Sequence, residues 1–287
     1  MAMPDLRQRL AREATDRYRP DGTAYRSLST AALDLLAGEQ AVDLRHIERT
    51  ALEMGIVPER YARNMATLSI EDQHRLLGCT ACIVGVGGLG GHVAAILARV
   101  GVGRMRLVDG DRFEDSNLNR QRFANRASLG QSKVAAAREQ LAAINPAVEV
   151  VTLAERLTAD NGSALLGDAD IAVDCLDTLQ ARRDLQAACR NAKMPMVSAA
   201  VAGVSGQIAV IHPQDQGLAA LYGNLAAAPD RGAETTLGNL PYAVTMLASL
   251  ECSEAVKTLL GRDSTLHGRL LIFDLEDLSF EVIRLEG

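Results

Sequence analysis

The feature that most constrains this chain is a cluster of glycines that follows a short apolar run. Within CIVGVGGLGGHVAAILARVGVGRMRLVDGD, which starts at Cys82, five of the seven residues from Gly85 to Gly91 are glycine. An apolar run, a glycine turn and a helical pattern in this order are typical of a strand–turn–helix unit that holds a nucleotide. Gly85, Gly87 and Gly90 match the spacing G-x-G-x-x-G, in which backbone N–H groups face a phosphate. The motif alone is compatible with NAD, FAD or ATP, and with a tight turn that binds no ligand.

Apolar runs alternate with helical patterns on both sides of this turn. The runs predict strands at 80–85, 104–109, 148–154, 170–175, 195–200 and 206–213, and the helical patterns predict helices at 89–100, 131–143, 158–166 and 179–192. A loose crossover segment at about 214–240, a helix over 242–260 and a pair of strands at 269–274 and 279–284 follow. Such alternation indicates a mostly parallel sheet that is covered on both faces. The predicted fold class is α/β, a Rossmann-like doubly wound sheet with C-terminal antiparallel strands.

Residues 1–57 are predicted to form a separate helical N-terminal extension, and residues 58–287 the main domain. One helical pattern covers residues 5–19, and two further helices begin after the capping residues Ser29 and Asp43. Two interpretations of this extension stay open. It serves either as a helical clasp that enlarges a dimer interface, which we favour slightly, or as an appendage that recognises a carrier or peptide.

Charge and composition exclude several classes of protein. The net charge of −6 gives no general electrostatic case for binding nucleic acid. No run approaches the roughly 18 apolar residues of a membrane span, and the charged N-terminus lacks a signal-peptide core. We therefore expect a cytoplasmic protein that does not contact a membrane. The five cysteines form no disulfide framework, and the C-x-x-C of Cys79 and Cys82 is expected to be buried as small apolar side chains.

The polar segment after the second strand favours ATP over a redox cofactor. Asp109 ends that strand, where a carboxylate can hold a ribose, and the dense polar sequence SNLNRQ follows it. Arg120 and Lys133 supply cations for phosphate oxygens. Asp177 ends the fourth strand at the same edge of the sheet, and a carboxylate beside phosphates usually holds Mg²⁺. Two cations, a carboxylate and a glycine turn favour cleavage of a triphosphate.

Together these motifs resemble the ThiF/MoeB/HesA family of ubiquitin-activating-enzyme-like adenylyltransferases. The matching segments are GVGGLG, VDGDRFEDSNLNRQ, LGQSKVAAAREQLAAINP, DCLD and PMVSAAVAGVSGQIAVIHP, which lie within about residues 58–213. Weaker similarity continues through LASLECSEAVKTLLG and LLIFDLED. The order and spacing of several motifs make the resemblance specific. It implies that residues 58–287 form a ThiF-type adenylation domain.

The resemblance also implies roles for individual residues, with ATP and Mg²⁺ as cofactors. Asp109 corresponds to the ribose-binding acid, and Asp177 to the acid that coordinates Mg²⁺. The segment RYARN resembles the family's R-Y-x-R-Q, whose second arginine, here Arg63, reaches into the neighbouring subunit of a homodimer. The implied catalytic residues are Arg63, Arg120, Lys133 and Asp177. The implied nucleotide contacts are Gly85, Gly87, Gly88, Gly90, Asp109, Ser116, Asn117, Arg120, Lys133, Asp177 and Thr178.

The chain departs from the family in its cysteines. Many relatives hold zinc with two C-x-x-C pairs, but residues 205–251 contain no cysteine and Cys252 stands alone. Because structural zinc needs four ligands, we expect no zinc site. Relatives that form a thioester carry a cysteine in the crossover segment, which this chain lacks. Two further expectations concern charged residues. Arg182 and Arg183 either aid a partner or solvate a helix, and we favour the second role; Asp111 faces solvent or supports its loop.

The function expected from the sequence is ATP-dependent adenylation of the C-terminal glycine of a ubiquitin-like sulfur-carrier protein with a Gly-Gly terminus, without a covalent enzyme thioester. The carrier belongs to the thiamine or the molybdopterin/tungstopterin type, and the sequence does not choose between them. The alternatives are adenylation of a peptide or tRNA base, a non-catalytic carrier-binding subunit and a Rossmann oxidoreductase. Arg120, Lys133 and Asp177 together argue against a catalytically dead subunit, and SNLNRQ argues against an oxidoreductase.

Overall fold

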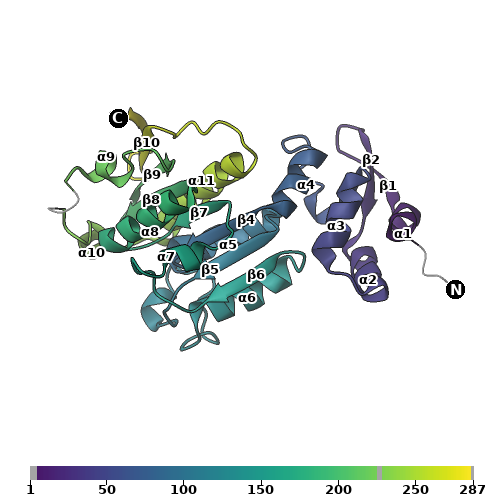
Figure 1. Ribbon diagram of the computed structural model, residues 1–287, viewed down its shortest axis with the longest axis horizontal. Helices are drawn as coiled ribbons and strands as arrows, with labels where there is room; N and C mark the ends of the chain where they lie inside the picture. Colours follow the sequence, from purple (N-terminus) through teal and green to yellow (C-terminus); the bar gives the residue numbers. More distant parts are fainter. Residues whose placement is uncertain (1–4, 225–227, 286–287) are drawn as a thin grey trace.

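A large mixed sheet forms the centre of the molecule in the computed structural model, which describes residues 5–224 and 228–285. Its strand order is β11-β10-β9-β8-β7-β4-β5-β6 (Figure 1). Neighbouring strands are parallel from β8 through β7, β4 and β5 to β6, and β9, β10 and β11 continue the sheet antiparallel. The strands are β4 (Thr80–Val84), β5 (Arg104–Val108), β6 (Glu149–Leu153), β7 (Ile171–Asp174), β8 (Met196–Ala202), β9 (Ser205–Ile211), β10 (Arg269–Asp274) and β11 (Ser279–Arg284).

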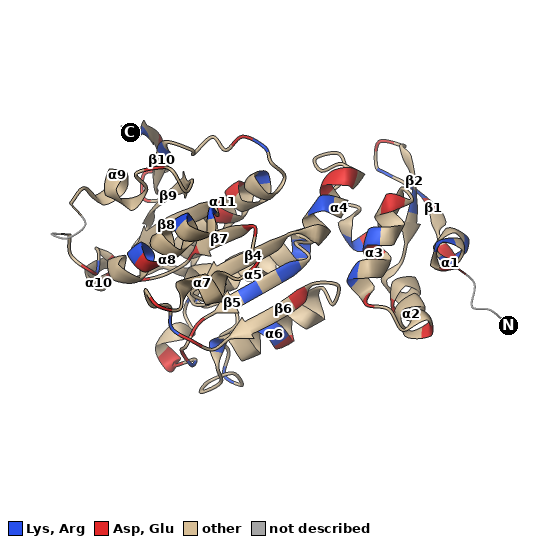
Figure 2. Ribbon diagram, in the orientation of Figure 1, with Lys and Arg blue, Asp and Glu red and all other residues tan. Residues whose placement is uncertain are grey.

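Helices cover both faces of this sheet, as the alternating pattern predicted. One face carries α5 (Gly88–Val100), α6 (Lys133–Ile144) and α11 (Pro241–Leu259), whose apolar residues form one buried cluster with the strands. The other face carries α7 (Gly162–Leu166) and α8 (Leu179–Ala192), which bury a second cluster. Figure 2 shows acidic and basic residues interspersed along helices such as α3 and α8. The predicted Rossmann-like, doubly wound sheet with C-terminal antiparallel strands is therefore confirmed.

The N-terminal extension is not purely helical, which corrects the prediction. The helices α1 (Leu6–Glu13), α2 (Thr30–Gln40) and α3 (Leu44–Glu53) are joined by a small sheet of β1 (Thr15–Tyr18), β2 (Ala24–Leu28) and β3 (Ile56–Pro58). The pattern predicted over 5–19 contains both α1 and β1. A turn closed by the bond from the Arg19 N–H to the Thr23 carbonyl connects β1 to β2, with Gly22 at φ 83°. Pro, Asp and Gly at 20–22 are typical turn residues.

The extension forms a lobe at one end of the molecule, beyond α4 (Ile70–Gly78), and the C-terminal strands lie at the other end (Figure 1). It has its own apolar cluster, which includes Leu10, Leu28 and Ile47. Ser69 and Asp72 close a capping box at the start of α4. The short helix η1 (Glu59–Tyr61) and the turn after it carry the chain from this lobe into α4.

A buried polar cluster joins the lobe to the large domain at the C-terminal end of α5. Tyr61 donates a hydrogen bond of 2.9 Å to Glu48 and accepts one of 2.9 Å from Asn145. Arg60 lies 3.1 Å from the Glu48 carboxylate and donates to the Asn145 side chain. Burial raises the pKa of Glu48 to about 7, although Arg60 and Tyr61 favour its charged form. These four side chains form the lobe junction.

The crossover segment contains two short helices, α9 (Leu218–Tyr222) and α10 (Glu234–Leu237), where the sequence predicted loose structure. Residues 225–227 of the predicted crossover lie outside the described residues. No helix among the described residues is long and apolar enough to cross a membrane. Cys79 and Cys82 are buried free thiols, as the sequence predicted, and burial raises the pKa of Cys82 to about 12.

Candidate active site

A cavity of about 720 Å³ opens where β4, β5 and β7 end. We call it the nucleotide cavity. It lies at the carboxyl edge of the parallel strands, where ligands bind in open α/β sheets. Arg63 and Gly90 do not contribute to its wall. The predicted residues that line it are Gly85, Gly87, Gly88, Asp109, Ser116, Asn117, Arg120, Lys133, Asp177 and Thr178.

Two glycines shape the turn between β4 and α5. Gly85 has a φ of 90°, and a Cβ atom there would lie 2.5 Å from the carbonyl oxygen of Cys175. A Cβ at Gly90 would lie 1.8 Å from the carbonyl oxygen of Gly85. Gly85 therefore allows the left-handed turn, and Gly90 allows α5 to pack closely on that turn. Gly87 and Gly88 remain on the cavity wall.

Asp109 and Asp111 organise the cavity beyond β5. The Asp109 carboxylate accepts hydrogen bonds of 2.8 Å from the backbone N–H groups of Val86 and Asp111, so it ties the glycine turn to its own loop. Lys133 Nζ lies 3.2 Å from Asp111 Oδ2 and 3.9 Å from Asp109 Oδ2. The sequence left two roles open for Asp111, facing solvent or supporting its loop. The ion pair with Lys133 agrees with the second role.

Arg156 is a further cation at this end of the cavity. It follows β6, lines the cavity and lies 2.8 Å from Asp111 Oδ1. Partial burial raises the pKa of Asp111, but Lys133 and Arg156 more than offset this, so the pKa lies below its ordinary value. Asp111 is therefore a carboxylate shared by two cations.

The SNLNRQ segment folds into a tight loop over the cavity. The short helix η2 (Asp115–Asn117) is capped by the Asn117 side chain, which accepts a 3.0 Å bond from the Glu114 N–H. Arg120 donates 3.0 Å and 2.9 Å bonds to the Ser116 carbonyl and the Asn119 side chain. Asn117 is buried, so part of its role is to fix the loop that carries Arg120.

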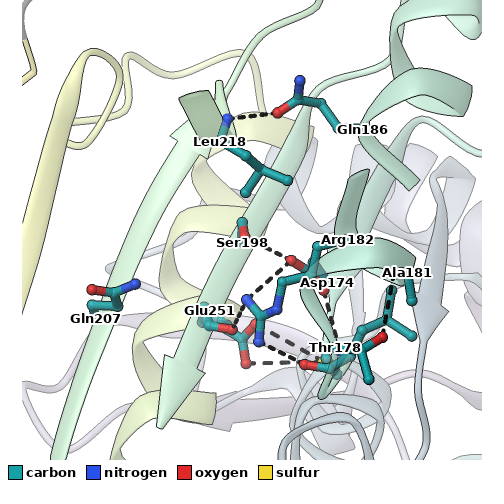
Figure 3. A network of polar contacts seen from close by, with 12 residues as sticks. Asp174, Thr178, Ala181, Arg182, Gln186, Ser198, Gln207, Leu218 and Glu251 are labelled. Carbon is teal, nitrogen blue, oxygen red and sulfur yellow. Dashed lines mark hydrogen bonds and ion pairs between the residues drawn. The ribbon is translucent and has the colours of Figure 1, made fainter. Parts of the chain in front are cut away.

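A buried ion pair lies beneath the end of β7, and Figure 3 shows its side chains. Asp174 accepts bonds from Arg182 at 3.3 Å and from the Ser198 hydroxyl at 2.6 Å (Figure 3). Arg182 also donates to the carbonyls of Ala199 and Leu176. The expectation that Arg182 solvates its helix is therefore wrong: the residue is only 7% exposed, and its guanidinium joins β7, β8 and α8.

Glu251 of α11 lies fully buried beside this ion pair (Figure 3). Its carboxyl oxygens lie 3.9 Å and 4.0 Å from the thiol of Cys175. Burial, with the charge of Asp174, raises the pKa of Glu251 well above its ordinary value. Burial therefore favours the neutral form of Glu251, and Asp174 is the carboxylate that pairs directly with Arg182.

A second cavity of about 410 Å³ adjoins the nucleotide cavity beneath the crossover segment. Its other walls come from β9, β10 and the crossover, and they include Gly206, Ile272 and Tyr222. Tyr222 accepts a 2.8 Å hydrogen bond from Gln207. The two cavities share Asp177, Arg182, Ala200, Val201 and Glu234. Molecules bound in the two cavities would therefore contact the same wall.

Arg63 lies outside both cavities of its own chain. It is exposed in the turn after η1. The neighbouring Asn64 donates 2.9 Å and 3.4 Å bonds to Gln73 and to the carbonyl of Val100, at the C-terminal end of α5. The glycine turn lies at the opposite end of this helix.

Sequence reasoning missed two cavity-lining cations, Arg156 and Arg231. Arg156 follows the third parallel strand at the carboxyl edge of the sheet, and this position was the signal that could have identified it. Arg231 lies in the crossover segment, 3.5 Å from Asp177. No periodic pattern surrounds it, so only the folded chain reveals the pairing.

Comparison with known proteins identifies the family of this chain. The model of the ThiF family matches residues 61–287. The chain belongs to the ThiF family. The molybdopterin-synthase adenylyltransferase of Escherichia coli is 32% identical over 234 residues, which are 79% of this chain and 92% of that protein. The heterocyst HesA protein of Trichormus variabilis is 34% identical over 79% of this chain and 85% of its own.

Some ThiF-family relatives are longer than this chain. It is 34% identical to the adenylyltransferase and sulfurtransferase MOCS3 of Culex quinquefasciatus over 79% of its own length but only 53% of that protein. The chain thus spans about half the length of such relatives. Among solved structures, PaaA superposes with a TM-score of 0.66 at 23% identity over 79% of this chain and 82% of its own, which supports the shared fold.

Proposed function

We propose that this protein uses ATP and Mg²⁺ to adenylate the C-terminal glycine carboxylate of a ubiquitin-like sulfur-carrier protein, with release of pyrophosphate. The observation that carries the proposal is the nucleotide cavity. Its lining combines the glycine turn with Asp109, Arg120, Lys133 and Asp177. Named adenylyltransferases among the ThiF-family relatives support the reaction type.

The residues present fit a nucleoside triphosphate with its metal. Gly87 and Gly88 line the cavity without side chains, so a phosphate can approach the backbone there, and the start of α5 supplies backbone N–H groups for it. The Asp109 carboxylate suits ribose hydroxyls. Asp177 offers hard carboxylate oxygens, the ligands that Mg²⁺ prefers, and its side chain is 71% exposed in the cavity wall. Bound there, the metal ion would neutralise phosphate charge.

The chain supplies position and charge in this reaction, and no covalent nucleophile. The carrier's carboxylate oxygen forms a bond to the α-phosphorus while the bond to the pyrophosphate oxygen breaks. Lys133 and Arg120 stabilise the negative charge that develops on the phosphates. In the free protein Asp111 holds Lys133, and its second cation, Arg156, keeps Asp111 paired when Lys133 turns to a phosphate.

The second cavity provides a route for the carrier's C-terminal tail. It leads from the crossover segment to the shared wall at Asp177, where a carboxylate would meet the α-phosphate. Gly206 and Ala200 line parts of this wall with small side chains, which leaves room for the backbone of a Gly-Gly terminus. We infer that the adenylate is the released product, because the crossover residues 214–240 contain no cysteine for an enzyme thioester.

The proposal includes a homodimer in which Arg63 serves the neighbouring subunit. Its exposure and its absence from the cavity of its own chain support this role. We also keep residues 1–57 as an extension and 58–287 as the adenylation domain. In this division the extension is a clasp at the far end of α5.

ATP–pyrophosphate exchange with Mg²⁺ tests the proposal. Each small carrier protein with a Gly-Gly terminus from the source genome is added in turn, with its truncated form lacking the last glycine as the matched control. We expect exchange with one intact carrier and none with its truncated form. Exchange with no carrier, despite ATP binding, would contradict the carrier assignment and favour a peptide or a tRNA base as acceptor.

A further inference from the structure

Arg231 lies where the nucleotide cavity and the second cavity meet. Its guanidinium is 3.5 Å from Oδ2 of Asp177, a carboxylate that lines both cavities. Arg231 itself lines the nucleotide cavity, whereas its neighbours Asp230 and Gly232 line the second cavity. The crossover segment therefore brings a cation to the wall that the two cavities share.

The backbone at Arg231 is fixed, although its side chain is exposed. The Leu179 N–H donates a 2.8 Å bond to the carbonyl of Asp230, and the Gln180 N–H donates a 2.8 Å bond to its carboxylate. These N–H groups belong to the first turn of α8 and lack partners within the helix. Asp230 thus anchors the crossover beside Asp177, while the Arg231 side chain, 58% exposed, can change its partner.

Two other cations on these walls, Arg182 and Lys133, are committed elsewhere. Arg182 is buried, and its terminal nitrogens donate to Asp174 and to backbone carbonyls. Lys133 lies with Asp109 and Asp111 at the end of β5. Among the described residues, Arg231 is the exposed, cavity-lining cation that lies beside an acid of the shared wall, Asp177.

We propose that Arg231 binds the terminal carboxylate of the acceptor polypeptide and brings it to the nucleotide, an inference that rests on the proposed function. A guanidinium presents parallel N–H donors that match a carboxylate. In the free protein one terminal nitrogen of Arg231 lies 3.5 Å from the Asp177 carboxylate. When Asp177 turns to a cofactor cation, Arg231 loses its partner and the acceptor carboxylate takes the place of Asp177. Arg231 then offsets the repulsion between two anionic reactants.

Calorimetric binding to protein saturated with the ATP analogue AMPCPP and Mg²⁺ tests this role without turnover. The probes are the carrier that supports exchange and the same carrier with a C-terminal amide. We expect wild type to bind the acid at least about tenfold more tightly than the amide, since a charged hydrogen bond contributes about 1.5–3 kcal/mol. Arg231→Ala should bind both forms alike, and Arg284→Ala, an exposed arginine on β11, should keep the wild-type preference.

The outcomes separate this role from the proposed function. An acid preference that survives in Arg231→Ala would overturn the role of Arg231 while leaving adenylation intact. Loss of AMPCPP binding in Arg231→Ala would overturn it as well, because the residue would then act on the nucleotide. A wild-type protein that neither binds AMPCPP nor catalyses exchange with any carrier would overturn both proposals.

Discussion

At the end of β5, single acidic residues hold Lys133 in place in the free protein. Lys133 is 7% exposed and lies within reach of two carboxylates, so it is positioned before any nucleotide arrives. Sequence reasoning identified Lys133, Asp109 and Asp177, because each occupies a recognisable position at a strand end or helix start. It could not identify the partner of Lys133, since Asp111 is one of several acids in a polar loop.

Lys133→Ala and Asp177→Ala should each lower ATP–pyrophosphate exchange at least about 100-fold, because the first removes a cation proposed to stabilise charge on the phosphates and the second removes the carboxylate proposed to hold Mg²⁺. The check is the exchange rate together with far-ultraviolet circular dichroism, which should stay unchanged. Arg126→Ala, which alters an exposed residue that lines neither cavity, serves as the control. Retention of exchange in either site variant would contradict the assignment.

The buried Arg182 contributes to the stability of the fold through its ion pair with Asp174. Arg182→Met removes the cation that pairs with Asp174 and leaves a buried carboxylate uncompensated, so we expect a loss of about 3–5 kcal/mol. Urea unfolding measures it, with the exposed Arg126→Met as the matched control. A loss within about 0.5 kcal/mol of the control would show that the ion pair contributes little.

At the scale of elements, the sequence predicts most of the sheet because each strand is an apolar run between helical patterns. It fails where local polar chemistry competes with the pattern. The helix predicted over 158–166 begins only at Gly162, because Asn161 accepts a bond from the Thr158 N–H and donates to the Arg156 carbonyl. It also misses β1, whose four residues are all exposed and show no alternation.

Gly90→Ala tests the packing of α5 on the glycine turn. A Cβ there would lie 1.8 Å from a backbone oxygen, so the helix must shift, and we expect a loss of about 1–3 kcal/mol and weaker AMPCPP binding. Gly91→Ala is the control, because its Cβ would lie 3.3 Å from the side chain of Arg122. Thermal unfolding and calorimetry measure both effects, and equal behaviour of the two variants would refute the packing argument.

At the scale of the whole molecule, the lobe junction links stability to pH. The folded protein favours protonated Glu48, whose pKa of about 7 exceeds the ordinary 4.5. This stability is present below about pH 4.5 and is lost as the pH rises through 7. Relative to Glu48→Gln, wild type should therefore lose up to roughly 3 kcal/mol between about pH 5 and pH 8. Urea unfolding at both pH values checks this, and the exposed Glu276→Gln should follow wild type.

A mixing experiment tests the homodimer. Arg63→Ala and Lys133→Ala should each be inactive alone, but a mixed dimer holds one site with both residues intact. With random exchange of subunits, the mixture should recover about a quarter of wild-type exchange activity. Absence of recovery, when labelled subunits demonstrably exchange, would rule out a shared site.

The helix α5 sets a fixed separation between Arg63 and the glycine turn. Its 13 residues span about 20 Å, with the glycine turn at one end and the Asn64 contact at the other. An arginine side chain does not bridge such a length, so α5 keeps Arg63 from serving its own chain. If Arg63 is needed for turnover, the rate per subunit becomes a function of protein concentration. Dilution alone, with every side chain unchanged, would then switch the enzyme off.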